Sequence, residues 1–249
     1  MFAEERIDFI ADILNTEGKV FVKELSNKFN VTEDCIRKDL KLLENKGIIR
    51  RTYGGAVLNR KKADYEKIEI RKEKNLESKR LIAKKAFELL NDFETIFLDI
   101  STTNIILADL IAKSNKKIIV VTNMIDIILA LKNSNVKTIC IGGVLSKDLD
   151  GFVGSATIEN INKYKFDKVF IGSCGVNIYD KTISTFDVDD GNTKSAILDS
   201  GKKVYIVMEN KKFYSDGVYK FADITEIDYI ITEIKPDQNV LDKIGEIII

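Results

Sequence analysis

The fold is decided by the stretch VFVKELSNKFNVTEDCIRKDLKLLENKGIIRRTYGGA, residues 20–56. Apolar residues recur in it at steps of three and four, first over 22–29 and again over 36–43. This spacing predicts two short helices, each with one buried face. Between them, Thr32 offers a hydroxyl that can cap the second helix, and the two acids that follow suit the positive first turn of that helix. Gly47 is expected to end the second helix in the left-handed conformation.

The end of the stretch predicts a β-hairpin. We expect a strand at 48–53, a turn at Gly54-Gly55 and a returning strand at 56–58. Two helices with a tight joint, followed by a hairpin, are typical of a winged helix-turn-helix, whose second helix enters the DNA major groove while the wing contacts the adjacent backbone. Basic residues outnumber acidic ones over 33–62, in a chain of net charge zero. The alternative is a solvated face on an ordinary helical hairpin, but the local basic excess favours DNA binding.

The residues expected at the DNA interface lie in the second helix and the wing. They are Thr32, Cys35, Arg37, Lys38, Lys41, Arg50, Arg51, Tyr53, Gly54 and Gly55.

The segment VTEDCIRKDLKLLENKGIIRRTYGGA resembles the DNA-binding signature of the DeoR family of bacterial regulators, which reads roughly V-S-x-x-T-I-R-R-D-L-x-x-L-E-x-x-G-x-x-x-R-x-H-G-G-A. The chain departs from it with Thr32 for Ser, Cys35 for Thr, Lys38 for Arg and Tyr53 for His. Thr32 keeps a capping hydroxyl. Lys38 keeps the charge but lacks the bidentate fork with which Arg contacts guanine. The resemblance implies binding to a double-stranded DNA operator.

Composition and length are typical of a globular protein of one to two domains, with 45% hydrophobic residues over 249 positions. No apolar run approaches the ~20 residues needed to cross a bilayer, and the first fifteen residues lack the pattern of a signal peptide, so we expect a cytoplasmic protein without membrane contact. Cys35, Cys140 and Cys174 are widely spaced and His is absent, which disfavours a disulfide framework and a metal site. Because Cys140 lies in an apolar run, we expect it to be a small buried hydrophobe.

We divide the chain into three parts. Residues 1–58 form the winged helix-turn-helix domain, which includes a further helix predicted at 4–15. Residues 59–77 are dense in charge and are interpreted as a linker that packs in part on the second domain. Residues 78–249 form a second domain.

The second domain alternates helices and strands. Helices are predicted at 79–91, 103–114, 125–132, 156–163 and 193–200, and strands at 94–100, 117–122, 136–142, 168–171, 203–208 and 228–232. Continuous Ile and Val runs indicate strands that are covered on both faces. The fold class is therefore α/β, a doubly wound and mostly parallel sheet behind the winged helix-turn-helix.

Small polar residues follow the strands, where parallel sheets bind ligands. After the first strand, hydroxyls at the start of a helix offer a phosphate cradle. The other polar loops follow the next four strands, at 122–123, 142–143, 172–175 and 209–212, and Asp187–Lys194 adds acids and a lysine.

The same loops resemble the effector domain of the DeoR family, with its motifs L-D-x-G-T-T, V-T-N, G-G, V-G, D-x-x-F-I-G-x-x-G, E-A-x-x-K and D-x-S-K-F. That domain is similar in fold to ribose-5-phosphate isomerase and glucosamine-6-phosphate deaminase, and in the family it binds phosphorylated sugars. The resemblance implies an effector site made of Asp99, Ser101, Thr102, Thr103, Asn123, Gly142, Gly143, Gly172, Asp190, Lys194 and Lys212. The chain departs from the family pattern with Ser101 for Gly, Asp190-Gly191 for Glu-Ala, Glu209 for Asp and Lys211 for Ser. These changes imply altered ligand selectivity or weaker binding.

Two functions are compared. The first is a transcription regulator, a repressor of sugar-metabolism genes, whose DNA affinity is set by a phosphorylated sugar, with no cofactor and no catalytic residue. The second is a sugar-phosphate isomerase or deaminase, with Asp99, Asp187, Asp189 and Asp190 as candidate carboxylates for proton abstraction. The enzyme hypothesis leaves the first sixty residues without a role. Because one winged helix contacts only a short half-site, the regulator is expected to be a homodimer or homotetramer.

Overall fold

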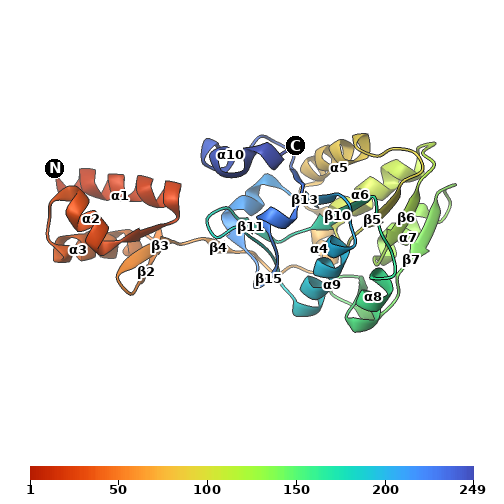
Figure 1. Ribbon diagram of the computed structural model, residues 1–249, viewed down its shortest axis with the longest axis horizontal. Helices are drawn as coiled ribbons and strands as arrows, with labels where there is room; N and C mark the ends of the chain where they lie inside the picture. The colour runs from red at the N-terminus through yellow and green to blue at the C-terminus, as the bar shows by residue number, and fades with distance from the viewer. The chain divides into compact units, whose positions relative to one another are not determined.

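The computed structural model describes residues 1–249, which divide into two compact units, Met1–Lys61 and Lys62–Ile249. Figure 1 traces both units along the chain. None of the helices combines the length and the apolar character that crossing a membrane would require.

The first unit is a winged helix-turn-helix, as the sequence predicts. Its elements are α1 (Ala3–Glu17), β1 (Lys19–Phe21), α2 (Val22–Phe29), α3 (Glu33–Asn45), β2 (Ile49–Thr52) and β3 (Gly55–Leu58). Apolar residues of the three helices, among them Ile10, Leu14, Ile36, Leu40 and Leu43, are almost fully buried in one cluster. Gly18 and Gly47 have φ values of 77° and 73°, so left-handed residues end α1 and α3.

The wing differs from the prediction by one residue. The turn is Tyr53-Gly54 rather than Gly54-Gly55, because Gly55 already belongs to β3 and pairs with Phe21 of β1. A Cβ on Gly55 would lie 2.1 Å from the carbonyl oxygen of Val20, whereas Gly54 has a φ of 82° and open space around it. The turn therefore requires glycine at position 54 for its positive φ. Position 55 requires glycine because β1, a strand that the sequence did not predict, approaches closely there.

Most of the charged stretch 59–77 belongs to the second unit. It contains β4 (Lys61–Lys62), α4 (Ile68–Glu73) and the start of α5. Ile68 is fully buried in the core of this unit, and Lys72 forms ion pairs with Asp126 and Asp150. The stretch is thus structured, anchored by one apolar residue among its charges.

The second unit is built on a six-stranded parallel sheet in the order β16-β13-β10-β5-β6-β7. Its strands are β5 (Thr95–Leu98), β6 (Ile119–Thr122), β7 (Lys137–Cys140), β10 (Lys168–Gly172), β13 (Val204–Val207) and β16 (Tyr229–Ile231). The chain fills one half of the sheet from β5 outward and then the other half from β10 outward. The sheet is therefore doubly wound, as predicted, and its order reverses between β5 and β10.

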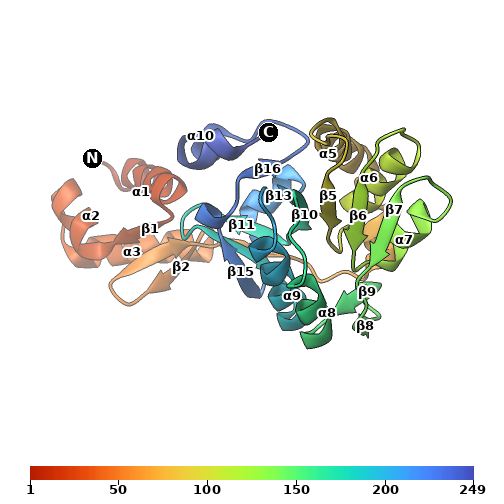
Figure 2. The ribbon, with the colours of Figure 1, turned by 45° about the vertical axis from the view of Figure 1, so that its right-hand side comes forward.

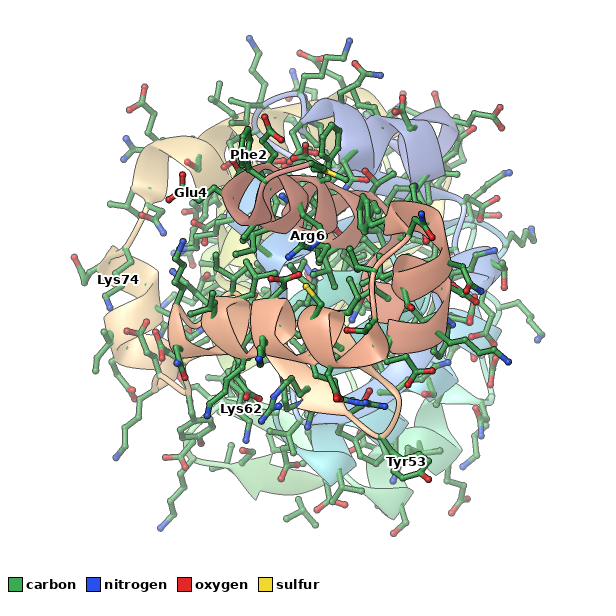
Figure 3. All side chains as sticks on the ribbon, turned by 90° about the vertical axis from the view of Figure 1, so that its left-hand side faces the viewer. Phe2, Glu4, Arg6, Tyr53, Lys62 and Lys74 are labelled. Carbon is green, nitrogen blue, oxygen red and sulfur yellow. The ribbon has the colours of Figure 1, made fainter.

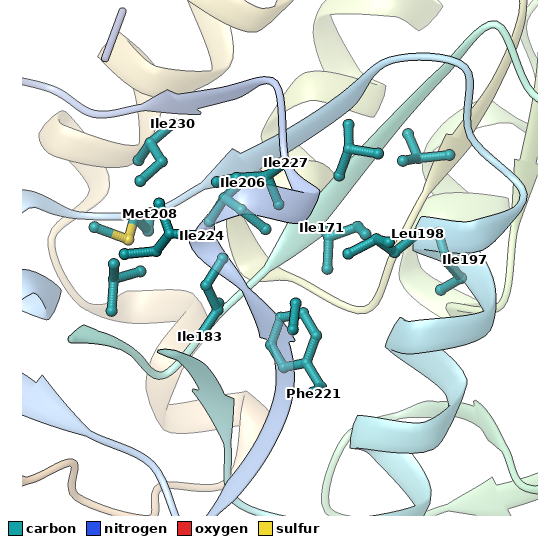
Figure 4. Close-up of a cluster of buried hydrophobic side chains, with 14 of the residues drawn as sticks. Ile171, Ile183, Ile197, Leu198, Ile206, Met208, Phe221, Ile224, Ile227 and Ile230 are labelled. Carbon is teal, nitrogen blue, oxygen red and sulfur yellow. The ribbon is translucent and has the colours of Figure 1, made fainter. Parts of the chain in front are cut away.

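Helices cover both faces of this sheet, as Figures 1 and 2 show. The helices are α5 (Leu76–Glu88), α6 (Thr102–Ala112), α7 (Ile125–Leu131), α8 (Ser155–Ile161), α9 (Val188–Asp199) and α10 (Gln238–Ile244). Residues of α5, α6 and α7 bury one face, and residues of α8, α9 and α10 bury the other. Figure 4 shows part of the second cluster, with Ile197 and Leu198 of α9 near Ile171 of β10.

Several small elements were not predicted. They are the hairpin β8 (Val144–Ser146) with β9 (Gly151–Val153), the antiparallel sheet of β11 (Gly175–Asn177), β12 (Thr182–Thr185) and β15 (Tyr219–Asp223), the short strand β14 (Ser215–Asp216), the 3-10 turns η1 (Asn210–Tyr214), η2 (Ile224–Glu226) and η3 (Gly245–Ile247), and α10. The strands β8, β9, β11 and β14 have only two or three residues, too few for an alternating pattern to reveal them.

Two expectations are corrected. Cys140 is exposed rather than buried, because β7 is an edge strand of the parallel sheet. Helix α9 begins at Val188 rather than Thr193, since Asp187 caps it by accepting from the backbone N–H groups of Asp189 and Asp190. Asp190 and Lys194 therefore lie one turn apart on the same helix, whereas the predicted helix contained only Lys194.

Candidate functional site

Helix α3 presents a basic outer face. The Thr32 hydroxyl caps it by accepting from the N–H of Cys35 at 3.3 Å. Because Ile36, Leu40 and Leu43 fix the inner face, the side chains of Arg37, Lys38 and Lys41 are exposed. This is the arrangement of a helix that enters the major groove of DNA.

Exposed arginines of this surface are paired within the domain. Arg37 contacts Glu33 at 2.6 Å and Asp34 at 2.8 Å, and Arg51 contacts Glu44 at 2.6 Å. Exposed pairs of this kind contribute roughly 0–1 kcal/mol, so DNA phosphates can replace the acids at little cost. Arg50 is exposed in the wing, and Tyr53 stands fully exposed at its tip, as Figure 3 shows.

Cys35 is directed differently from the other residues expected at DNA. Its sulfur accepts a hydrogen bond at 3.1 Å from the Arg6 guanidinium, which lies between α1 and α3 (Figure 3). Arg6 also donates to both oxygens of Asp39, at 2.6 and 3.1 Å, and these two side chains are only 7% and 5% exposed. Hydrogen bonding to Asp39 raises the pKa of Arg6 above its ordinary value. The pair links α1 to α3; a charge on the apolar face of each helix was the signal in the sequence.

In the second unit, a cavity of about 520 Å³ lies beside the carboxyl ends of β5 and β10. This is the point where the strand order reverses, and such points bind ligands in doubly wound sheets. Residues from several segments line it: Tyr65 and Arg71; Ile100; Val144, Ser146, Asp148, Leu149 and Val153; Gly172, Ser173 and Cys174; Thr185, Phe186, Asp187, Asp189, Asp190 and Lys194; and Val218.

Three of the residues expected at the effector site line this cavity, namely Gly172, Asp190 and Lys194. Behind them, the Lys194 ammonium forms an ion pair with Asp99 and lies 3.3 Å from Asp190. Asp99 also accepts from the N–H of Gly172 at 3.0 Å, and Asp190 accepts from the Thr185 hydroxyl at 2.5 Å. The structure therefore joins Asp99, Asp190 and Lys194 into one buried cluster.

The charges in this cluster are strongly perturbed. Burial raises the pKa of Asp99 to about 6, and the Asp190 carboxylate adds to this, while Lys194 opposes it. Burial lowers the pKa of Lys194, but the two carboxylates outweigh it and leave that pKa above its ordinary value. Lys194 thus remains a cation shared between two acids, with no free charge for a ligand.

Residues at the start of α6 are buried and do not line the cavity. Ser101, Thr102 and Thr103 are at most 6% exposed, and the Ser101 hydroxyl accepts from the N–H of Thr103 at 3.2 Å. Asn104 was not predicted as a site residue. Its amide donates to the carbonyls of Asp99 and Phe170, at 2.9 and 2.8 Å, and so ties β5 to β10.

Four other expected residues lie outside the lining. Asn123 is buried, and its amide donates to the carbonyl of Phe152 at 2.9 Å. Gly142 and Gly143 are exposed. The ammonium of Lys212 donates to the carbonyl of Ser173 at 2.6 Å, and burial lowers its pKa to about 8.

The sequence did not select Arg71 and Tyr65, because both lie in the stretch interpreted as a linker. Arg71 lines the cavity, and its guanidinium has neither a hydrogen bond nor an ion pair. The Lys79 ammonium donates to the backbone carbonyl of Arg71 and so stabilises the backbone at this position. The Tyr65 hydroxyl donates to Asp148 at 2.7 Å, which raises the pKa of Tyr65 to about 12.

A winged helix-turn-helix joined to a doubly wound unit with its own cavity defines a DNA-binding protein with a separate sensor domain. Residues 6–62 match the family description "DeoR-like helix-turn-helix domain", and residues 74–234 match "DeoR C terminal sensor domain". The chain belongs to the DeoR family of transcription regulators.

Relatives match along almost the whole chain. The Bacillus subtilis (strain 168) protein named uncharacterized HTH-type transcriptional regulator FruR is 32% identical over 94% of this chain and 92% of its own. The HTH-type transcriptional repressor GlcR of the same organism is 30% identical over 98% and 95%. The lactose phosphotransferase system repressor of Staphylococcus aureus (strain NCTC 8325 / PS 47) is 28% identical over 96% of each chain. Ribose 5 phosphate isomerase A from Neisseria gonorrhoeae, a solved structure, is similar with a TM-score of 0.41 at 16% identity, over 55% of this chain and 53% of that one.

Proposed function

We propose that the protein is a cytoplasmic repressor of sugar-metabolism genes, whose affinity for its operator is set by a phosphorylated sugar bound in the cavity of the second unit. The names of relatives support this direction, since they include a repressor of a lactose phosphotransferase system. It would act as a homodimer or homotetramer, because one winged helix covers only a half-site.

The observation that carries the proposal is the unpaired Arg71 guanidinium in a cavity at the switch point of the sheet. Arginine is suited to phosphate because its planar donors match two phosphate oxygens at once. Carboxylates of Asp148 and Asp187 in the same lining can accept hydrogen bonds from sugar hydroxyls.

The test combines two measurements on the full chain. Thermal shift with glucose 6-phosphate, fructose 6-phosphate, fructose 1-phosphate and inorganic phosphate measures binding, since a ligand at 100 times its Kd adds about 2.7 kcal/mol. Fluorescence anisotropy with DNA from upstream of the gene measures operator affinity with and without each compound. Arg71→Met is expected to weaken sugar-phosphate binding about tenfold or more, whereas Arg80→Met, a change at an exposed arginine outside the lining, leaves binding unchanged. No DNA binding at low salt, or no compound that changes it, would overturn the proposal.

The isomerase or deaminase alternative has one supporting observation, the raised pKa of the buried Asp99. Against it, the Asp99 carboxylate lies outside the cavity lining and is bonded to Lys194 and Gly172. Turnover of ribose 5-phosphate or glucosamine 6-phosphate by the purified protein would support the enzyme instead.

A further inference from the structure

The segment that follows the DNA-binding unit also forms one wall of the cavity. Tyr65 lies three residues after Lys62, where the second unit begins, and it is the cavity-lining residue nearest in sequence to the DNA-binding unit. A ligand that changes the position of Tyr65 therefore acts on the chain just behind the wing.

Another lining residue, Asp148, contacts this segment at three points, one of which is an ion pair with Lys67 at 3.9 Å. Asp148 accepts from the Tyr65 hydroxyl at 2.7 Å through its carboxylate, and from the N–H of Ile68 at 3.1 Å through its carbonyl. The Tyr65 ring also packs edge-on against Phe186, with 5.4 Å between ring centroids. Asp148 and Phe186 both line the cavity.

The two ends of the segment are held with different strength. Ile68 is fully buried and Lys72 is paired with two aspartates, so the later part is fixed in the fold. Tyr65 is 55% exposed, and its only hydrogen bond goes to Asp148. Before Tyr65, the backbone N–H of Ala63 donates to a carbonyl of β14 at 2.9 Å, so the Tyr65 hydroxyl is the hydrogen bond of this earlier part that lies in the cavity.

We propose that Tyr65 and Asp148 form a latch that the effector opens. A hydroxyl of the sugar takes the carboxylate oxygen that Tyr65 occupies, and release of Tyr65 changes the DNA affinity of the preceding unit. The exchange replaces one hydroxyl donor with another, so the ligand opens the latch at a small net cost. Such a contact, present in one state and absent in the other, is what coupling between two sites requires. The latch rests on the proposed function, because it uses the same effector and the same cavity.

Tyr65→Phe tests the latch in the full chain, since it removes the hydroxyl and keeps the ring against Phe186. The quantity measured is the ratio of the DNA Kd with and without the hexose phosphate among the three named above that gives the largest thermal shift. We expect this ratio to fall about fivefold or more towards one, while the thermal shift is retained. Asp148→Ala removes both the acceptor of the latch and the proposed sugar contact, so it should lower the ratio and the thermal shift together, and retention of both would overturn the latch.

Tyr214→Phe is the matched control. The Tyr214 hydroxyl donates to Asp237 at 2.6 Å, and Tyr214 also has its pKa raised to about 12, but neither residue lines the cavity. This variant is expected to keep the ratio of the unmodified protein. The latch is overturned if Tyr65→Phe keeps that ratio too, or if it loses the thermal shift, which would make Tyr65 a ligand contact. A missing response in the unmodified protein would instead refute the proposed function, and the latch with it.

Discussion

Breaking the buried pair between Arg6 and Asp39 is expected to unfold the DNA-binding unit in part. Asp39→Asn leaves the Arg6 side chain, which is 7% exposed, without an opposite charge between α1 and α3. Losing one partner of such a pair costs about 3–5 kcal/mol, whereas replacing both partners with apolar residues is often neutral or stabilising. We therefore expect a loss of this size for Asp39→Asn, and a much smaller change for the double variant Arg6→Met with Asp39→Leu.

The exposed pair of Glu33 with Arg37 provides the control. Its shortest distance is 2.6 Å, the same as in the buried pair, but its side chains are 46% and 54% exposed. Such a pair contributes about 0.3–0.5 kcal/mol, so Glu33→Gln should have little effect on stability. Distance is matched between the two variants, and burial is what differs.

Hydrogen–deuterium exchange of the full chain measures the effect locally. Peptides of α1 and α3 should lose protection in Asp39→Asn and keep it in Glu33→Gln and in the double variant. DNA affinity should follow the same order for the two single variants. Equal protection in Asp39→Asn and Glu33→Gln would refute the reasoning that burial, and not contact distance, sets the energy of the pair.

Three further outcomes are expected. Arg50→Ala should leave stability unchanged and reduce the slope of log affinity against log salt by about one, because one phosphate contact is lost; an unchanged slope places Arg50 away from DNA. Gly55→Ala should destabilise the wing by about 1–3 kcal/mol in exchange experiments, since its Cβ would meet the backbone of Val20 at 2.1 Å. Gly54→Ala should cost only about 1–2 kcal/mol, because Gly54 has a positive φ but open space around it. A larger loss for Gly54→Ala than for Gly55→Ala would contradict this reasoning. Burial raises the pKa of Asp99 from 3.8 to about 6, so the folded state binds more protons than the unfolded state between these values, and the Asp99 contribution to stability falls as pH rises through that window. Urea unfolding at several pH values should show this slope, and Asp99→Asn should remove it.

Local sequence patterns were sufficient to predict the amphipathic helices and the alternation of helices and buried strands. The two helices of the first stretch, the cap at Thr32 and the alternation that produced the parallel sheet all follow from spacing along the chain. Short strands escaped, since β8, β9 and β11 have three residues each, too few to show a period of two. Cys140 was judged by its apolar neighbours, although its strand lies at the edge of the sheet.

Sequence alone determined the class of each unit and the basic outer face of α3, because these depend on contacts between residues close in the chain. Only the tertiary structure decided the composition of the cavity. Lys194 reaches Asp99 across 95 positions and Tyr65 reaches Asp148 across 83, and no local pattern encodes such meetings. Arg71 was left out of the expected effector site because it lies in the charged stretch interpreted as a linker. Only the fold of the second unit placed it in the wall of the cavity.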